Sequence, residues 1–246
     1  MAGRLNRAAW RGFDTVFKPW MRGRMHVCMA GVPRAIPAGS PVMLVSNHVS
    51  WWDGFLLRAI QKAIRPASPL YTVALERELV SHPILRLIGG IGLTPSSPAS
   101  ILHALRSLAD KCVECPDSVV GYFPQGCISP SFRRPLGFTR GVELFIRRLG
   151  PVTVLPVSIH VEPLTGAAPT AFVQIGTPQA SDTSDITSSS LERVVTQLLD
   201  ASLASLALHG ESAAAMWQDT RTLYPSTTHP RSHFRNSDTG AATYDA

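Results

Sequence analysis

The chain has 246 residues, the length of one ordinary domain that can bury a sizeable hydrophobic core. Hydrophobic residues make up 45% of the chain and charged residues only 16%, a low charge density for a freely soluble surface. Lysine and arginine outnumber aspartate and glutamate by 23 to 17, which gives a net charge of +6. This charge fits an anionic partner such as membrane headgroups, nucleic acid or a phosphorylated substrate, and it equally fits ordinary solubility.

Three features point to the cytoplasm or the cytoplasmic face of a membrane. No apolar run reaches the roughly 18–20 residues needed to span a bilayer. The N-terminal segment is punctuated by Arg4, Arg7, Arg11 and Lys18, so it lacks the apolar core of a secretory signal. Four cysteines are too few for a disulfide scaffold, which agrees with a reducing compartment. We expect a peripheral or monotopic protein on the cytoplasmic face of a membrane.

Residues 3–24 have the pattern of an amphipathic helix, so residues 1–24 are predicted to form a separate membrane-interface segment. Apolar residues recur at helical spacing with basic residues among them: Trp10, Phe13, Val16, Phe17 and Trp20, with Arg4, Arg7, Arg11, Lys18 and Arg22. Aromatic anchors interleaved with basic residues are typical of a helix that lies in the membrane interface. The alternative is a helix packed on its own domain, and both hold if the helix bridges domain and bilayer.

Residues 25–224 are predicted to form the main domain, in which short apolar strands alternate with helical stretches. Strands are predicted near 26–30, 42–46, 70–74, 119–123, 152–160 and 171–175, and helices near 53–64, 76–88, 99–114 and 141–149. This alternation predicts an α/β fold with a mostly parallel central sheet flanked by helices. Functional residues then gather where strands lead into loops and helix starts.

The C-terminal part of the chain is predicted to be helical and then irregular. A Pro/Ser/Thr/Asp stretch after Gly176 predicts a loop to Ser190, and residues 191–224 have the pattern of one or two terminal helices. Residues 225–246 lack a core-forming pattern and are predicted to be a disordered tail.

His48 and Asp53 are the most informative pair in the chain. They lie five positions apart in the segment Ser-Asn-His-Val-Ser-Trp-Trp-Asp, directly after the strand-like residues 42–45. A histidine can take a proton from an alcohol, and a nearby carboxylate can fix its tautomer and stabilise the imidazolium that forms. The spacing alone also occurs in structural or exposed pairs, so the context of strand, Asn-His, aromatic pair and Asp carries the interpretation.

A second segment strengthens this interpretation. Residues 119–123 have the pattern of a buried strand, and they run directly into Pro124, Gln125, Gly126 and Cys127. Together the two segments resemble the glycerolipid acyltransferase family, whose hallmark is His-x4-Asp followed some tens of residues later by Phe-Pro-Glu-Gly. The resemblance covers residues 41–159, about half of the chain, and includes the Val-Pro-Val-type strand at 155–159.

The resemblance implies roles for these residues. His48 would act as the general base on the acceptor hydroxyl, and Asp53 would orient His48. Pro124, Gln125 and Gly126 would help bind the acceptor. The acyl donor, acyl-CoA or acyl carrier protein, is a substrate, so no cofactor is expected. No metal site is predicted, because no His/Cys/Asp cluster supplies a third and fourth ligand.

The sequence departs from the family where relatives hold a phosphate. The usual Glu-Gly-Thr-Arg is replaced here by Gln125, Gly126, Cys127 and Ile128, and the stretch at 89–95 ends without the family's arginine. In the family both arginines are associated with the glycerol-phosphate part of the acceptor. Their loss argues against glycerol 3-phosphate or lysophosphatidate bound in the usual manner.

Replacement cations follow Gly126 in the sequence. Arg133, Arg134 and Arg140 lie in the loop after it, where an arginine fork could grip a phosphate bidentately. We take Arg134 and Arg140 as candidate substrate-binding residues. The alternatives are contact with coenzyme A phosphates, contact with anionic lipid, or a solvated basic loop.

The sequence therefore predicts an O-acyltransferase that moves a fatty acyl group to a lipid hydroxyl, with a lysophospholipid or related lyso-lipid as acceptor. The alternatives are a non-phosphorylated acceptor such as a glycolipid, aminolipid or glycosylated terpenoid, a thioesterase, or a lipid-binding relative. Expected partners are membrane lipids and the acyl donor. Nucleic acid is not expected, because the basic residues form no recognisable binding motif.

Overall fold

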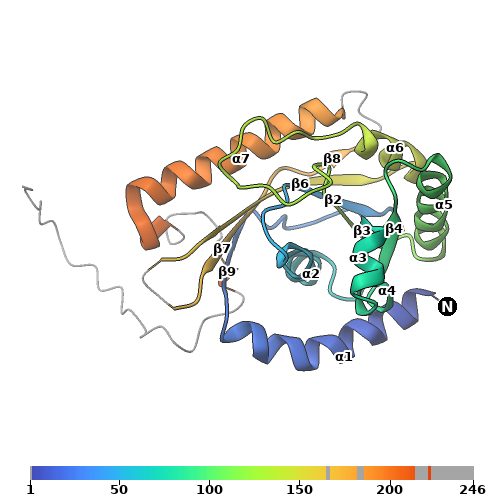
Figure 1. The fold of residues 1–246 in the computed structure, drawn as a ribbon, viewed down its shortest axis with the longest axis horizontal. Helices are drawn as coiled ribbons and strands as arrows, with labels where there is room; N and C mark the ends of the chain where they lie inside the picture. The colour runs from blue at the N-terminus through green and yellow to red at the C-terminus, as the bar shows by residue number, and fades with distance from the viewer. Residues whose placement is uncertain (1, 165–166, 182–185, 214–220, 223–246) are drawn as a thin grey trace, which may run out of the picture.

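The computed structural model describes residues 2–164, 167–181, 186–213 and 221–222, and it shows an α/β fold (Figure 1). The strands of the described residues form one nine-stranded sheet, and helices cover both of its faces. The predicted fold class is confirmed. The tail predicted at residues 225–246 lies outside the described residues.

The bounds of most predicted elements agree with the structure to within two residues. The strands are β1 His26–Ala30, β2 Val42–Ser46, β3 Leu70–Leu75, β4 Gly90–Leu93, β5 Val119–Tyr122, β6 Thr153–Glu162, β7 Thr170–Ile175, β8 Gln179–Ala180 and β9 Arg221–Thr222. The helices are α1 Ala2–Arg22, α2 Asp53–Ile64, α3 Glu76–Ser81, α4 Ile84–Leu87, α5 Pro98–Glu114, α6 Gly141–Leu149 and α7 Ser188–His209, followed by a 3-10 turn at Gly210–Ser212.

Several segments differ from the sequence-based expectation. The helix predicted at 76–88 is two short helices, because the residue before Pro83 leaves the helical region. The glycine-rich stretch after it forms β4, an additional edge strand. Helix α7 starts at Ser188, earlier than predicted, because Thr187 and Ser190 form a reciprocal cap. The described residues 221–222 belong to strand β9, which pairs with β1, where a helix was predicted.

The strand order β4-β3-β5-β2-β6-β7-β1-β9 explains where the site forms. Strands β4, β3, β5, β2 and β6 run parallel to one another, whereas β7 is antiparallel to β6. Parallel strands end at the same edge of a sheet, and open α/β sheets bind ligands at that edge. The loops that follow β2, β3 and β5 therefore meet there.

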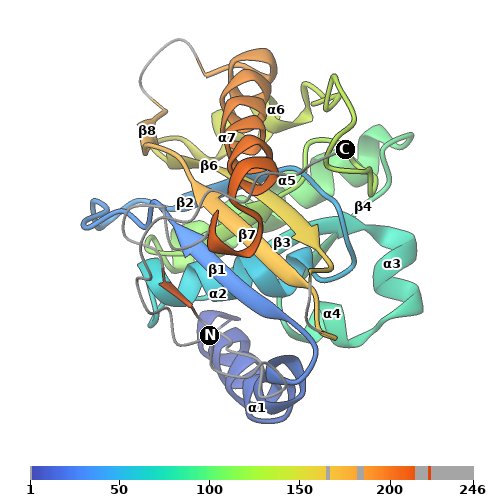
Figure 2. The ribbon, with the colours of Figure 1, turned by 90° about the vertical axis from the view of Figure 1, so that its left-hand side faces the viewer.

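Two hydrophobic cores lie on opposite faces of the sheet. One contains residues of α1 and α2, and the other contains residues of α5, α6 and α7. In Figure 1, α1 and α2 lie below the sheet, α7 and α6 lie above it, and α5 lies at its right-hand end beside β4. Figure 2 shows α1 and α7 at opposite ends of the turned view.

Helix α1 packs against its own domain through two of the residues that the sequence suggested as membrane anchors, Trp10 and Phe13. Trp10 is buried in the core under α2, and Phe13 stacks on Phe55 with ring centroids 5.5 Å apart. The Asn6 side-chain amide donates to the carbonyl oxygens of Leu70 and Ile88, each at 3.0 Å. Packing of α1 on its own domain is thereby confirmed. The separate status of residues 1–24 and an additional contact with a bilayer remain predictions.

A buried ion pair also holds α1 to α2. One Arg58 guanidinium nitrogen lies 2.9 Å from a carboxylate oxygen of Asp14, Lys62 contacts the same oxygen, and the guanidinium lies over the Trp10 ring at 4.8 Å. Burial alone would raise the pKa of Asp14, but hydrogen bonds and charges from Arg58 and Lys62 outweigh it and lower that pKa. The carboxylate is therefore more stable in the folded protein than in the unfolded chain.

Replacing Asp14 with Asn should lower the free energy of unfolding by roughly 3 kcal/mol, because the buried guanidinium of Arg58 loses its counter-charge. The exposed pair Glu76–Arg86 supplies the matched control, since Glu76→Gln should cost less than about 1 kcal/mol. The pKa of Asp14 is lower in the folded protein than the ordinary value of 3.8. Its contribution to the free energy of unfolding is therefore complete above pH 3.8, and it disappears as the pH falls through the lower pKa of the folded state. Urea unfolding at pH 7 measures both variants, and equal losses would contradict the assignment.

Candidate active site

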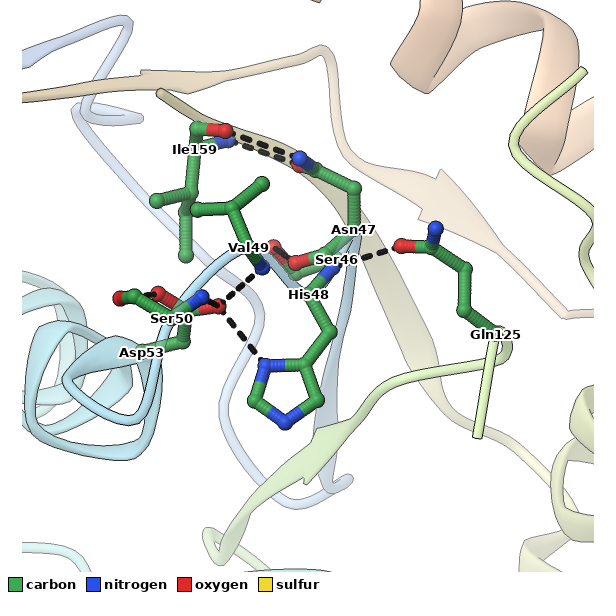
Figure 3. Close-up of polar contacts among 8 residues, drawn as sticks. All are labelled: Ser46, Asn47, His48, Val49, Ser50, Asp53, Gln125 and Ile159. Atoms are coloured by element: carbon green, nitrogen blue, oxygen red, sulfur yellow. Dashed lines mark hydrogen bonds and ion pairs between the residues drawn. The ribbon is translucent and has the colours of Figure 1, made fainter. Parts of the chain in front are cut away.

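The loop that carries His48 is fixed to the sheet by Asn47. Strand β2 ends at Ser46, and the buried side chain of Asn47 continues the pairing with β6. Its amide nitrogen donates to the carbonyl oxygen of Ile159, and its amide oxygen accepts from the Ile159 N–H, both at 2.8 Å (Figure 3). The Asn47 side chain thus makes the hydrogen bonds that a strand backbone would make, and it fixes the position of the His48 backbone.

Asp53 is the centre of the hydrogen-bond network. Its side chain is 0% exposed and lies in the first turn of α2, where unpaired backbone N–H groups favour a negative charge. One oxygen accepts from the N–H groups of Val49 at 2.6 Å and Ser50 at 3.0 Å, and the other accepts from the Ser50 hydroxyl at 2.5 Å. These donors satisfy an ionised carboxylate without a cation.

This network fixes the tautomer of His48. Nδ1 of His48 lies 2.8 Å from the Asp53 oxygen that already accepts two backbone N–H groups. Since an ionised carboxylate only accepts hydrogen bonds, Nδ1 carries a proton, so in the neutral ring the lone pair is on Nε2. The ring also stacks on Phe123 with centroids 4.3 Å apart and planes 18° apart. Figure 3 shows the second ring nitrogen pointing away from Asp53.

The loop after β5 holds both backbone groups of His48. The side-chain oxygen of Gln125 accepts from the His48 N–H at 2.6 Å, and the Ser129 N–H donates to the His48 carbonyl oxygen at 2.8 Å. Gly126 closes the turn with a φ of +67°, a conformation that favours glycine. The predicted convergence of the two motifs is confirmed, and the oxygen of Gln125 is engaged in joining them.

A cavity of about 840 Å³ lies beside His48. Its walls are largely apolar and include Trp10, Trp51, Phe55, Leu79, Leu85 and Ile88, while the segment 122–128 forms the wall nearest the imidazole. This size lies at the upper end of small-molecule sites, and an apolar lining with a few polar groups is the usual character of such sites. The exposed fraction of the His48 side chain, 23%, is therefore the part that a ligand can reach.

A model of the acyltransferase family matches residues 31–160, more than half of the chain. The chain belongs to the acyltransferase family. Among solved structures it is similar to the 1-acyl-sn-glycerophosphate (LPA) acyltransferase PlsC from Thermotoga maritima, with 21% identity and a TM-score of 0.48 over 80% of this chain and 77% of that one. The protein is thus an acyltransferase, and the site described above lies within the matched segment.

The candidate substrate-binding residues of this acyltransferase divide into two groups. Pro124, Gln125 and Gly126 line the cavity. Arg134 does not, because its guanidinium pairs with Asp200 of α7, with Nε 3.1 Å from the carboxylate, and donates to the carbonyl oxygen of Ser131. Arg140 is exposed and lies between two residues that line the cavity, so its contact with substrate stays a prediction.

Arg77 is a site residue that the sequence analysis missed. It lies in the first turn of α3, directly after β3, and lines the cavity together with Glu78, 3.3 Å away. Its position directly after β3 could have identified it, because β3 is a neighbour of β5 in the parallel sheet and ends at the same edge. It supplies a positive charge beside the cavity although the family's two arginines are missing.

A buried histidine, His160, anchors the loop that supports His48. His160 of β6 is buried, its Nδ1 lies 2.8 Å from the Ser131 hydroxyl oxygen, and its Nε2 lies 3.1 Å from a Glu162 carboxylate oxygen. Burial lowers the pKa of His160, and the nearby Glu162 opposes this only in part. The neutral ring accepts from Ser131 and donates to Glu162, which ties the segment after Ser129 to the sheet.

Stability should fall as pH drops below the ordinary histidine value of 6.5, because the unfolded chain protonates His160 before the folded protein does. The variant His160→Gln, which cannot titrate, should lose this part of the pH dependence. Urea unfolding midpoints at neutral pH and in mild acid measure the difference between the two proteins. An unchanged pH dependence in the variant would show that His160 is not the responsible group.

Proposed function

We propose that this acyltransferase moves a fatty acyl group from acyl-CoA or acyl carrier protein to the hydroxyl of a lyso-lipid at the cytoplasmic face of a membrane. His48 is the general base and Asp53 orients it. The observation that carries the proposal is the contact of His48 Nδ1 with Asp53 at 2.8 Å, which directs the other ring nitrogen, Nε2, away from the carboxylate beside a large apolar cavity.

The chemistry needs only one proton carrier. Nε2 of His48 takes the proton of the acceptor hydroxyl as its oxygen attacks the thioester carbonyl carbon. The C–S bond then breaks, and the thiolate leaves with the proton that Nε2 held. Because a thioester is already activated, no covalent acyl-enzyme is required. Asp53 stabilises the imidazolium during the step, and Phe123 keeps the ring plane fixed.

Arg77 supports an acceptor with a polar or anionic head. Among the described residues that line the cavity, it is the only arginine or lysine. A guanidinium binds phosphate oxygens bidentately, so a lysophospholipid head placed near α3 would find a partner there. Its pairing with Glu78 lowers the net charge of this region, which also suits a neutral glycolipid head or an aminolipid.

A hydrolase is the second candidate, because the same base can activate water in place of an alcohol. The cavity is large and reaches His48, so a bound acyl donor without an acceptor would expose its thioester to water. Release of CoA without an acylated product distinguishes this reaction from transfer.

His48→Ala should lower kcat for transfer by about 100- to 10,000-fold, the usual range for losing a positioned general base. Asp53→Asn should lower kcat by a factor in the same range, because the variant no longer fixes the tautomer of His48 and no longer carries the negative charge. The two residues act as one unit, so the double variant should be no worse than His48→Ala alone. Thermal unfolding of each variant checks the fold, and strictly additive losses in folded variants would contradict the shared role.

The acceptor can be identified with radiolabelled acyl-CoA supplied with lysophosphatidate or with a total lipid extract, using His48→Ala as the blank. Product from lysophosphatidate means a phosphate acceptor. Product from the extract alone means another acceptor, whose mass gives its identity. If CoA is released without product, the hydrolase is favoured.

Arg77→Gln should raise KM for a phosphate-bearing acceptor about tenfold and leave KM for a neutral acceptor nearly unchanged, because a charge-assisted hydrogen bond is lost. Arg86→Gln is the matched control, since Arg86 pairs with Glu76 and does not line the cavity. An equal rise in KM for both variants would remove Arg77 from the acceptor site.

A further inference from the structure

We propose that α3 and Trp51 form a site for a zwitterionic head group, in which a singly charged phosphate and an ammonium group of the acceptor lie side by side. We call it the head-group site and define it by Arg77, Glu78 and Trp51, which all line the cavity. The site holds the acceptor of the proposed function and therefore rests on that function. Lysophosphatidylethanolamine is a lyso-lipid with such a head.

The charges that line the cavity balance one another. Among the described residues of its wall, Arg77 is the only arginine or lysine and Glu78 is the only aspartate or glutamate. A phosphate monoester such as the head of lysophosphatidate carries about 1.5 to 2 negative charges at pH 7. Glu78 would repel that head, and Arg77 alone would hold it. A phosphodiester with an attached ammonium carries one charge of each sign, so both side chains find an opposite charge.

Arg77 and Glu78 can exchange each other for a ligand. The two residues are neighbours at the start of α3, with Nε of Arg77 3.3 Å from a Glu78 carboxylate oxygen. Their side chains are 76% and 47% exposed, and an ion pair in such a setting contributes little to stability. A phosphate can therefore replace Glu78 beside the Arg77 guanidinium, where it binds bidentately, while the ammonium binds the Glu78 carboxylate.

The other charged pair of α3 and α4 does not reach the cavity. Arg86 contacts Glu76, and neither residue lines the cavity wall. The Glu76 carboxylate lies over β4, in space that a Cβ on Gly92 would occupy. Glu76 is therefore engaged elsewhere, and the carboxylate that an ammonium in the cavity can bind is that of Glu78.

Trp51 adds an aromatic face to the site. It lies three positions after His48, lines the cavity and is 49% exposed. Its ring centroid lies 6.3 Å from that of His82, whose backbone N–H donates to the carbonyl oxygen of Glu78 at 2.8 Å. Trp51 thus lies between the loop that carries His48 and the helix that carries Glu78. An ammonium within about 6 Å of a tryptophan ring is attracted by the negative face of the ring.

Exposure orders the cavity from a polar end to an apolar end. The head-group site is exposed, whereas Leu79, directly after Glu78, is 1% exposed and Ile88 is 6% exposed. Burial of an acyl chain against such residues is favourable, while removal of a charged head from water is costly. A lyso-lipid therefore binds with its head at the start of α3 and its chain against the buried wall.

The experiment compares kcat/KM for two short-chain acceptors dispersed below their micellar concentrations, lysophosphatidylethanolamine and lysophosphatidylglycerol. Their heads share the phosphodiester and differ in the ammonium. Wild-type protein should prefer the ethanolamine head about tenfold. Glu78→Gln should reduce this preference about fivefold, and Trp51→Leu about threefold. Arg77→Gln should lower kcat/KM for both acceptors and keep the preference, because both heads carry the phosphate.

Glu76→Gln is the matched control, since it removes a carboxylate from the same turn of α3 without reaching the cavity. This variant should keep the wild-type preference. Thermal unfolding checks that each variant is folded. The head-group site is overturned if wild-type protein prefers lysophosphatidate or lysophosphatidylglycerol, if Glu78→Gln keeps the full preference, or if Glu76→Gln loses as much of it.

Binding in the absence of chemistry separates the head-group site from the reaction. His48→Ala keeps all three residues of the site, so calorimetry should show that it binds lysophosphatidylethanolamine about tenfold more tightly than lysophosphatidylglycerol. If it does so and wild-type protein acylates neither lipid, the proposed function fails and the head-group site stands. If wild-type protein acylates lysophosphatidate best, the proposed function stands and the head-group site fails.

Discussion

The buried carboxylate of Asp53 is the constraint on which the rest of the site depends. A charge removed from water is costly unless every lone pair finds a donor, and here the donors are Nδ1 of His48, two backbone N–H groups and the Ser50 hydroxyl. These bonds force the chain to turn tightly between β2 and α2. Asn47 and Gln125 hold the two sides of that turn, so the lone pair of Nε2 has one orientation.

The sequence could predict the features that depend on neighbours in the chain. His48 and Asp53 lie on one turn after a buried strand, so their spacing was informative, and helix α2 begins and ends as predicted. The pairing of Arg134 with Asp200 joins residues 66 positions apart and leaves no local pattern. Arg77 carried no motif either. Its position at the end of β3 became informative once the strand order placed β3 beside β5.

Helix α1 shows why periodicity alone leaves alternatives open. An apolar stripe at helical spacing predicts that one face is buried, but it does not say whether protein or lipid covers it. The structure assigns Trp10 to the core and leaves Leu5 and Val16 outside. The apolar residues of α1 therefore form two stripes, and a single amphipathic pattern described them incompletely. Contact with the domain and contact with a bilayer need different residues, so one does not compete with the other.

Helix α2 connects the His48–Asp53 pair to α1, the helix predicted to lie in a membrane interface. Its first residue is Asp53, and one and a half turns later Arg58 binds Asp14 of α1. His48 and helix α1 are thus both fixed to a single rigid element. If α1 lies in the interface, the depth of Nε2 relative to the headgroups is set by α2 and by the Asp14–Arg58 pair. A base held at one depth suits an acceptor whose hydroxyl lies at one depth, which is the case for a lyso-lipid in a bilayer and not for a substrate free in solution.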